Sequence, residues 1–453
     1  MQVMTHVLLG LLLAAAPEAP PRAIVLVTID TLRADRLGAY GYTRPTSPFL
    51  DRLAREGAVF EQAFASAAHT SPAHASLFTG LHPSQHGVRS NGQGFPDRAE
   101  GGYPTLAETL AGAGYDTAAV SAVNFLRPIT RGFRVQDFGG SARGYRTAEG
   151  TVDRAVAYLA ESRPRERFFL WLHLYDPHLP HRAPEDLTRE FAFATPQAVE
   201  DWAQGVLAKR PGVQGVYPSS AALATRHGNY DAEVRFADRE IERLFEALRR
   251  AGLLDDTLFI VTADHGEGLG DHGYDGHGPL LYDEVLHVPL VLWRGGRYAG
   301  LRLDSLWRHV DLLPTLAEWT GARLQMGSFT LQGRSLLPAL RDPGAPQTPA
   351  LAFAQRRPAG PKLRHYEKGE VFALRDLDLK YIVRTGGHDE MYDLRRDPLE
   401  ERNLAGQPTA LARSLESRAR DTFAQASREG TRAQARPPSR ETEEELRALG
   451  YVQ

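Results

Sequence analysis

Leu258–Glu267 reads LFIVTADHGE, an apolar run that ends in an aspartate, a histidine and a glutamate. An uncharged, β-branched run of this kind is typical of a strand buried on both faces of a parallel sheet. Two further runs have the same form: Ala23–Ile29 (AIVLVTI) is followed by Asp30, and Phe168–Leu174 (FFLWLHL) leads into the loop that carries His178. Because open α/β sheets bind ligands at the carboxyl ends of their strands, we expect these polar residues to share one site.

Helical patterns lie between these runs. Asp231–Ala251 places apolar side chains on one stripe at helical spacing and ends at Gly252, and Thr105–Ala113 has the same character. Strands that alternate with helices predict a mostly parallel sheet covered on both faces. Beyond about residue 346 the pattern changes to short strand-like runs that indicate a small antiparallel unit: Val371–Leu374, Tyr381–Arg384 and Glu390–Tyr392. Asp421–Arg440 is polar and predicts an exposed helix or a linker.

The N-terminus contains a short apolar run, Val7–Ala16 (VLLGLLLAAA). Its length and small-residue exit favour a signal peptide over residues 1–19, although a buried strand or short helix is the alternative. The catalytic domain is then expected over residues 20–345 and the C-terminal subdomain and tail over residues 346–453. If the segment is a signal peptide, the protein is exported to the periplasm or secreted. This run is too short to span a bilayer, and no other stretch is long enough, so we expect no stable membrane span.

The composition excludes several classes of protein. The chain has 453 residues, a formal net charge of −3 and no cysteine. A chain without a global basic field is not expected to bind nucleic acid. The absence of cysteine excludes disulfides, zinc–thiolate sites, iron–sulfur clusters and thiol catalysis.

Hydroxyl residues stand directly before a predicted helix in Thr70–Gly80 (TSPAHASLFTG). Ser71 suits the N-cap and Pro72 the first helical position, so Thr70 is expected at the positive end of the helix dipole. A phosphate or sulfate group would bind at that end. His74 follows Thr70 by one helical turn, which would place it within reach of the bound anion or the leaving group.

A hydroxyl group alone is a poor nucleophile because its pKa lies far above neutrality. A divalent cation bound to the oxygen of Thr70 would lower that pKa and shield the incoming anion. Asp30, Asp264 and His265 supply the carboxylate and imidazole ligands that such an ion requires. The sequence therefore predicts a metal site made of Asp30, Thr70, Asp264 and His265.

His178 lies in a proline-flanked loop after a buried strand. It is either a turn histidine or a functional residue that donates a hydrogen bond to the oxygens of the ester. A second metal site formed by Asp176, His178 and His277 is a further alternative.

Eight blocks of sequence follow one another along the chain: TIDTLRADRLGAYGY from Thr28, TSPAHASLFTGLHPSQHGV from Thr70, LYDPHLPH from Leu174, DAEVRFADREIERLF from Asp231, DDTLFIVTADHGEGLGDHG from Asp255, LYDEVLHVPLVL from Leu281, HVDLLPTLAEWTG from His309 and EMYDLRRDPLEERNLA from Glu390. In this order they resemble the sulfatase-type members of the alkaline phosphatase superfamily over nearly the whole chain. The resemblance implies an α/β fold, a three-layer αβα sandwich with a large mixed, mostly parallel sheet. It also implies a small C-terminal antiparallel α+β subdomain.

Four positions depart from the sulfatase pattern. The nucleophile position, a cysteine or serine oxidised to formylglycine in sulfatases, is Thr70, which cannot give that aldehyde. The arginine four residues later is His74, and the second aspartate of the first metal motif is Thr31. The expected catalytic lysine is absent, and His277 is the nearest replacement. These departures resemble the threonine-nucleophile branch, which includes nucleotide pyrophosphatase/phosphodiesterases and lipoteichoic-acid-type phosphoglycerol transferases. That branch implies zinc or manganese, with calcium as the alternative, and no other cofactor.

We therefore predict a metal-dependent hydrolase that cleaves phosphate mono- or diesters through a covalent Thr70 intermediate, which water then hydrolyses. His74, His178 and His277 are expected to stabilise or protonate the ester oxygens. The expected substrate is a small-molecule, glycan-linked or lipid-linked phosphate or sulfate ester. One alternative is a sulfuric ester hydrolase, arylsulfatase-like, that acts without formylglycine. The other is a non-catalytic metal-binding protein on the same fold.

Overall fold

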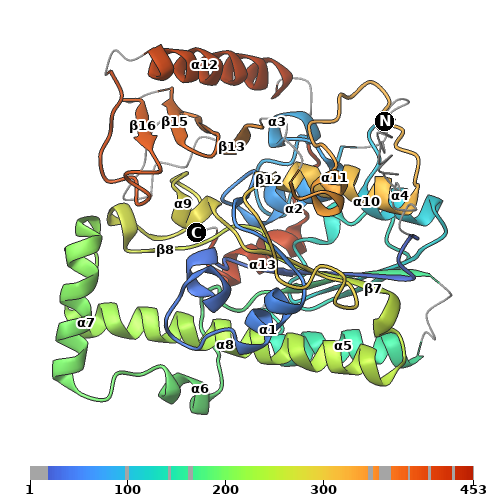
Figure 1. Ribbon diagram of the computed structural model, residues 1–453, viewed down its shortest axis with the longest axis horizontal. Coiled ribbons are helices and arrows are strands. Elements are labelled where there is room, and N and C mark those ends of the chain that lie inside the picture. The colour runs from blue at the N-terminus through green and yellow to red at the C-terminus, as the bar shows by residue number, and fades with distance from the viewer. Residues whose placement is uncertain are drawn as a thin grey trace, which may run out of the picture.

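The structure is a computed structural model that describes residues 19–96, 102–140, 144–161, 167–344, 350–356, 369–385, 388–406, 410–430 and 434–451. Apart from Ala19, the predicted signal peptide lies outside these residues. At the centre is an eight-stranded sheet (Figure 1). Its strands, in spatial order, are β11 (Leu301–Leu303), β2 (Ala58–Phe60), β10 (Leu290–Trp293), β7 (Thr257–Ala263), β1 (Ala23–Ile29), β6 (Phe168–Leu174), β4 (Asp116–Ser121) and β5 (Val135–Phe138).

The sheet is mixed but mostly parallel. Strand β1 pairs in parallel with β6 on one side and β7 on the other, and only β10 runs antiparallel to its two neighbours. All residues of β1, β6 and β7 are buried, which explains their continuous apolar sequences. The predicted α/β class and the mostly parallel sheet are confirmed.

Helices cover both faces of the sheet and give three layers (Figure 1). One layer contains α1 (Pro48–Glu56), α5 (Ala148–Glu161) and α8 (Ser220–Arg250). The other contains α2 (Thr70–Thr79), α4 (Leu106–Gly112) and α10 (Leu312–Thr320). The remaining elements of this part of the chain are α3 (Pro83–His86), α6 (Glu185–Glu190), α7 (Pro196–Lys209), α9 (Asp283–Leu286), α11 (Leu337–Arg341), β3 (Ala63–Phe64), β8 (Gly268–Leu269), β9 (Asp275–Gly276) and β12 (Trp307–Arg308).

Helix α8 is longer than the sequence pattern indicates. The periodicity predicts a start at Asp231, but the helix begins at Ser220 because the Ser219 side chain accepts a hydrogen bond from the Ala222 N–H and caps it. The apolar stripe is weak in that first part, so a periodic pattern alone misses it. Helix α4 matches its predicted range, and Thr105 caps it together with Glu108.

The C-terminal unit is a four-stranded antiparallel sheet of β13 (Ala352–Arg356), β14 (Val371–Arg375), β15 (Leu379–Arg384) and β16 (Glu390–Asp393). Helix α12 (Ala410–Gly430) packs on this sheet (Figure 1). It begins before the predicted polar segment, and Leu415, Ala419 and Ala426 are buried in the apolar cluster against the sheet. The helix is therefore a packed part of the subdomain, unlike the predicted exposed helix or linker. The last helix, α13 (Arg440–Ala448), returns to the core.

None of the helices in the described ranges is both long and apolar enough to cross a bilayer.

Candidate active site

The carboxyl ends of the central strands bring the predicted acidic residues together. Ile29 on β1 lies beside both Leu174 on β6 and Ala263 on β7, so the three strands end at the same level. Asp30 and Asp264 follow directly, and both side chains are completely buried. The register of the sheet therefore confirms that the three strands end at one shared edge of the sheet.

Asp30, Asp264 and His265 form a compact cluster. One ligand atom from each lies within 4.8 Å of the others. Both oxygens of Asp30, Oδ2 of Asp264 and Nε2 of His265 are buried and have no hydrogen-bond partner. Buried polar groups are almost always paired, so four unpaired atoms aimed at one place indicate a missing ligand. A divalent cation fits this mixed set of two carboxylates and one imidazole.

The electrostatics of the cluster agree with a cation site. Burial, together with repulsion from Asp264 and Glu267, raises the pKa of Asp30 well above its usual range. Burial also raises the pKa of Asp264 to about 8. A positive ion between these carboxylates would offset the cost of their desolvation and of their mutual repulsion.

Hydrogen bonds orient the ligands of this cluster. The Asp264 Oδ1 accepts from the N–H groups of Thr31, at 3.2 Å, and His265, at 2.8 Å, and the Oδ2 stays unpaired. His265 Nδ1 lies 2.9 Å from the Gly266 carbonyl oxygen, to which it donates, so Nε2 carries a lone pair. Thr31 has a φ of 56°, uncommon for a β-branched residue, and its backbone serves the site. The side chain of Thr31 supplies no carboxylate here, as the sequence predicts.

Thr70 stands at the first position of α2. The helix begins at Thr70 with His69 as N-cap, two residues earlier than the Ser71 cap that the sequence predicts. The N–H of Ser71 is satisfied instead by Asn91 Oδ1, at 2.9 Å. The Thr70 hydroxyl is buried without a hydrogen-bond partner, and its side chain is near enough to Asp30 to lower the pKa of that carboxyl in part. The nucleophile candidate and the ligand cluster are therefore neighbours.

His74 lies behind the cluster. Its Nδ1 is 2.8 Å from the Thr70 carbonyl oxygen and its Nε2 is 2.9 Å from Thr28 Oγ1. With both ring nitrogens engaged, His74 ties the nucleophile helix to strand β1, and burial lowers its pKa to about 4. Its Nδ1 is 3.8 Å from Asp264 Oδ2. Direct contact of His74 with a substrate stays a prediction.

His173 lies at the site although the sequence analysis assigned it no role. Its Nε2 has no partner and lies 3.4 Å from Asp30 Oδ2. With His74 and Asp264 it forms a second group of three potential ligand side chains. The available signal was a single imidazole near the end of the otherwise apolar strand FFLWLHL. It now joins the candidate ligand set.

His178 and His277 meet beside the cluster from two separate loops. Their Nε2 atoms are 3.0 Å apart, and the His277 ring lies against His265 with ring centroids 4.3 Å apart. The Nδ1 atoms face backbone carbonyls, that of Leu179 at 2.5 Å and that of Ala68 at 3.0 Å. Each Nδ1 therefore donates, and the two Nε2 atoms face one another as acceptors unless a proton lies between them.

The three residues of the alternative second metal site do not bring their ligand atoms together in this way. Asp176 is buried with both oxygens unpaired, and burial together with repulsion from Glu233 raises its pKa well above the usual range. Within the described ranges, two groups of three ligand side chains meet within 4.8 Å, and neither contains Asp176.

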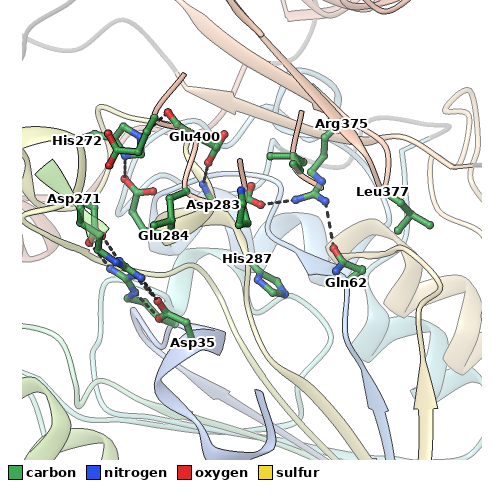
Figure 2. A pocket seen from close by; sticks show the side chains of 16 residues that line it. Asp35, Gln62, Asp271, His272, Asp283, Glu284, His287, Arg375, Leu377 and Glu400 are labelled. Atoms are coloured by element: carbon green, nitrogen blue, oxygen red, sulfur yellow. Dashed lines mark hydrogen bonds and ion pairs between the residues drawn. The ribbon is translucent and has the colours of Figure 1, made fainter. Parts of the chain in front are cut away.

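A cavity of about 260 Å³ opens elsewhere, between the loop after β8 and the C-terminal subdomain (Figure 2). Its charged side chains largely pair with one another. Asp283 contacts Arg375 at 2.5 Å and Lys380 at 2.8 Å, and His272 contacts Glu284 at 2.8 Å. The two Asp283 pairs join the subdomain to the core, and the cavity is not lined by the unpaired ligand cluster.

The chain is similar to a known protein family and to several known proteins. The family model described as Sulfatase matches residues 22–322. The chain is 24% identical over 426 residues to the Delta 4,5-hexuronate-2-O-sulfatase of Bacteroides thetaiotaomicron. The match covers 87% of this chain and 87% of that protein. It is 27% identical over 486 residues to the multifunctional alkaline phosphatase superfamily protein PehA of Trinickia caryophylli, covering 86% of this chain and 92% of that protein.

Among solved structures, the phosphonate monoester hydrolase of Agrobacterium radiobacter superposes with a TM-score of 0.71 at 23% identity, covering 90% of this chain and 96% of that one. This likeness shows the fold. The family match extends over well over half of the chain and includes Asp30, Thr70 and the Asp264–His265 pair. The chain therefore belongs to the sulfatase family within the alkaline phosphatase superfamily, whose members are typically metal-dependent hydrolases.

Proposed function

We propose that this protein hydrolyses phosphate mono- or diesters with Thr70 as the nucleophile. The observation that carries the proposal is the buried, unpaired Thr70 hydroxyl beside the unpaired ligand atoms of Asp30, Asp264 and His265. Threonine is a secondary alcohol, so its oxidation would give a ketone, and the formylglycine aldehyde cannot form. The hydroxyl must therefore react as it stands.

Each residue of the site has a separate role in the proposed reaction. A divalent cation, when bound by Asp30, Asp264 and His265, supplies a lowered pKa for the Thr70 hydroxyl and charge neutralisation for the ester. The Thr70 oxygen attacks phosphorus in line, the bond to the leaving oxygen breaks, and the hydroxyl proton passes to solvent or a neighbouring carboxylate. Water then cleaves the phosphothreonine. The His178–His277 pair can donate to an ester oxygen when one of the two facing Nε2 atoms carries an added proton.

Phosphorus is favoured over sulfur because of the second step. A threonine phosphate can be hydrolysed by in-line attack of water on phosphorus with the same groups that assisted the first step. A threonine sulfate would need the same attack on sulfur without the hydrated aldehyde by which sulfatases expel sulfate.

The test is a panel of 4-nitrophenyl phosphate, bis(4-nitrophenyl) phosphate and 4-nitrophenyl sulfate, given to metal-stripped and to zinc- or manganese-restored protein. We expect hydrolysis of a phosphate ester to exceed that of the sulfate, and to require the metal. Faster hydrolysis of the sulfate would contradict the proposal.

The second candidate is a sulfuric ester hydrolase, favoured by the name of the hexuronate sulfatase to which the chain is similar. Under this alternative a sulfated sugar is the substrate, and the sulfate arm of the same panel identifies it. A non-catalytic binding protein would turn over no ester. We also propose export of the protein. Recovery of the intact N-terminus from the cytosolic fraction would contradict it.

A further inference from the structure

The C-terminal helix ends in a turn that directs the chain back into the core. Helix α13 is followed by Gly450, which has a φ of 85°. The Gly450 N–H donates to the Arg447 carbonyl at 3.1 Å, and the Tyr451 N–H donates to the Leu446 carbonyl at 2.8 Å. These two bonds define a Schellman motif, which favours glycine because its left-handed conformation strains other residues. The turn fixes the direction in which Tyr451 leaves the helix.

The helix itself is held against the core by specific contacts. Ser439 caps it by accepting from the Thr442 N–H. Glu445 accepts from the Asn124 N–H at 2.6 Å. Leu446 is buried in the main core. The position of Tyr451 is therefore set by the fold.

Tyr451 reaches the site described above. Its hydroxyl lies 2.7 Å from His178 Nε2 and 3.4 Å from the hydroxyl of Tyr175. Its ring also lies beside His277, with ring centroids 5.9 Å apart. The Thr70 side chain is near enough to the Tyr451 hydroxyl to lower its pKa in part, although burial raises that pKa well above its usual range. A residue near the far end of the chain thus lies against the histidine pair and close to the nucleophile candidate.

The hydrogen bonds of the His178 ring show that Nε2 is the nitrogen that accepts from the Tyr451 hydroxyl. Its Nδ1 donates to the Leu179 carbonyl, so Nε2 accepts, and the facing Nε2 of His277 cannot donate without an added proton. The Tyr451 hydroxyl is the closer of the two tyrosine hydroxyls that can satisfy this nitrogen.

We infer that Tyr451 is a positioning residue of the active site, whose hydroxyl donates to His178 Nε2 and holds that ring beside His277. The inference rests on the proposed function, because that function assigns the His178–His277 pair to the ester oxygens. No other residue of the C-terminal segment is assigned to the reaction. The role of α13 is to hold Tyr451 in its position.

The test compares Tyr451→Phe with Tyr115→Phe in the metal-restored protein. Tyr115 is a buried tyrosine whose hydroxyl donates to the Pro21 carbonyl at 2.5 Å, at the opposite end of the strands from the ligand cluster, so it is a matched control. We expect Tyr451→Phe to lower kcat by about 10- to 100-fold with KM changed less than about threefold. The control should keep its kcat, and both variants should unfold at similar temperatures.

A double-mutant cycle separates positioning from a general structural effect. If Tyr451 acts through His178, the loss from Tyr451→Phe should largely disappear in a His178→Ala background. Fully additive losses, or a Tyr451→Phe kcat within twofold of the wild type, would overturn the inference.

The failure of the proposed function is distinguishable from the failure of this inference. If the wild type cleaves only the aryl sulfate, the phosphoester proposal fails and the same cycle is read with the sulfate. If the wild type cleaves neither ester, binding of vanadate is measured by calorimetry. The inference then predicts about tenfold weaker binding to Tyr451→Phe than to the control, and equal binding overturns it.

Discussion

Asp264 Oδ2 and His265 Nε2 lie 3.4 Å apart, and neither atom has a hydrogen-bond donor among the residues that the structure describes. Two lone pairs that face one another in a buried space repel, and neighbouring Asp30 adds two further unpaired oxygens. A cation is the simplest group that satisfies all of these atoms at once.

Replacement of Asp264 by Asn should therefore abolish metal binding without unfolding the metal-free protein. The Asn oxygen can still accept from the Thr31 and His265 N–H groups, and its amide can donate toward Asp30. Elemental analysis should show loss of the ion. In the wild type, added metal should raise the unfolding temperature, and this rise should vanish in the variant. Full metal content in Asp264→Asn would refute the ligand set.

Removal of the Thr70 hydroxyl should stop turnover. Thr70→Ala is expected to lower kcat by on the order of 10³-fold or more, because no other nucleophile stands at that place. Thr70→Ser keeps the hydroxyl and should retain measurable activity. The control is Thr79→Ser at the other end of the same helix, where the hydroxyl bonds the Ala75 carbonyl at 2.7 Å. Undiminished activity in Thr70→Ala would remove this residue from the mechanism.

The His272–Glu284 pair predicts a pH dependence of stability. Burial alone would lower the pKa of His272, but attraction to Glu284 and then Glu400 outweighs it and raises the pKa to about 9 (Figure 2). A raised histidine pKa contributes stability that is complete below pH 6.5 and is lost as the pH rises through about 9. A shift of this size corresponds to at most about 3 kcal/mol.

Denaturant unfolding of the wild type between pH 6.5 and 9.5 measures this effect. His272→Gln should unfold more easily at the lower pH and show a flatter pH profile. His388→Gln, at an exposed histidine, is the control and should follow the wild type. Identical profiles for His272→Gln and the wild type would show that the ion pair does not form.

Gly92 couples the C-terminal helix to the nucleophile helix. Its N–H donates to Ser71 Oγ at 3.1 Å, and a β-carbon added to it would lie 2.6 Å from Thr442 and 2.9 Å from Leu446. Gly92→Ala should therefore cost about 1–3 kcal/mol more than Gly114→Ala, because Gly114 has a similar positive φ but open space around it.

Activity provides the second measurement for this pair of variants. Displacement of α13 should lower kcat in Gly92→Ala, while Gly114→Ala should keep the wild-type value. Equal unfolding free energies in the two variants would mean that the contact with α13 contributes nothing.

The strand-end argument worked because it depends on backbone geometry. A buried parallel strand has a recognisable composition, and the polar residue after it must lie at the sheet edge, so Asp30 and Asp264 could be paired from the sequence. Their role as metal ligands stays a prediction. The start of α8 and the packing of α12 could not be read in this way, because their apolar residues are sparse and their partners are distant in the chain.

The sequence by itself determined the family and the α/β class, since both follow from residue identity and from the local periodicity of apolar residues. It also shows the threonine at the position of the proposed nucleophile. Only the tertiary structure decided that His74 lies behind the cluster, that His173 lies against Asp30, and that Tyr451 reaches His178. Such contacts depend on how elements pack across the molecule. That packing sets the direction of each side chain and its hydrogen-bond partner. Neither can be predicted from the local sequence.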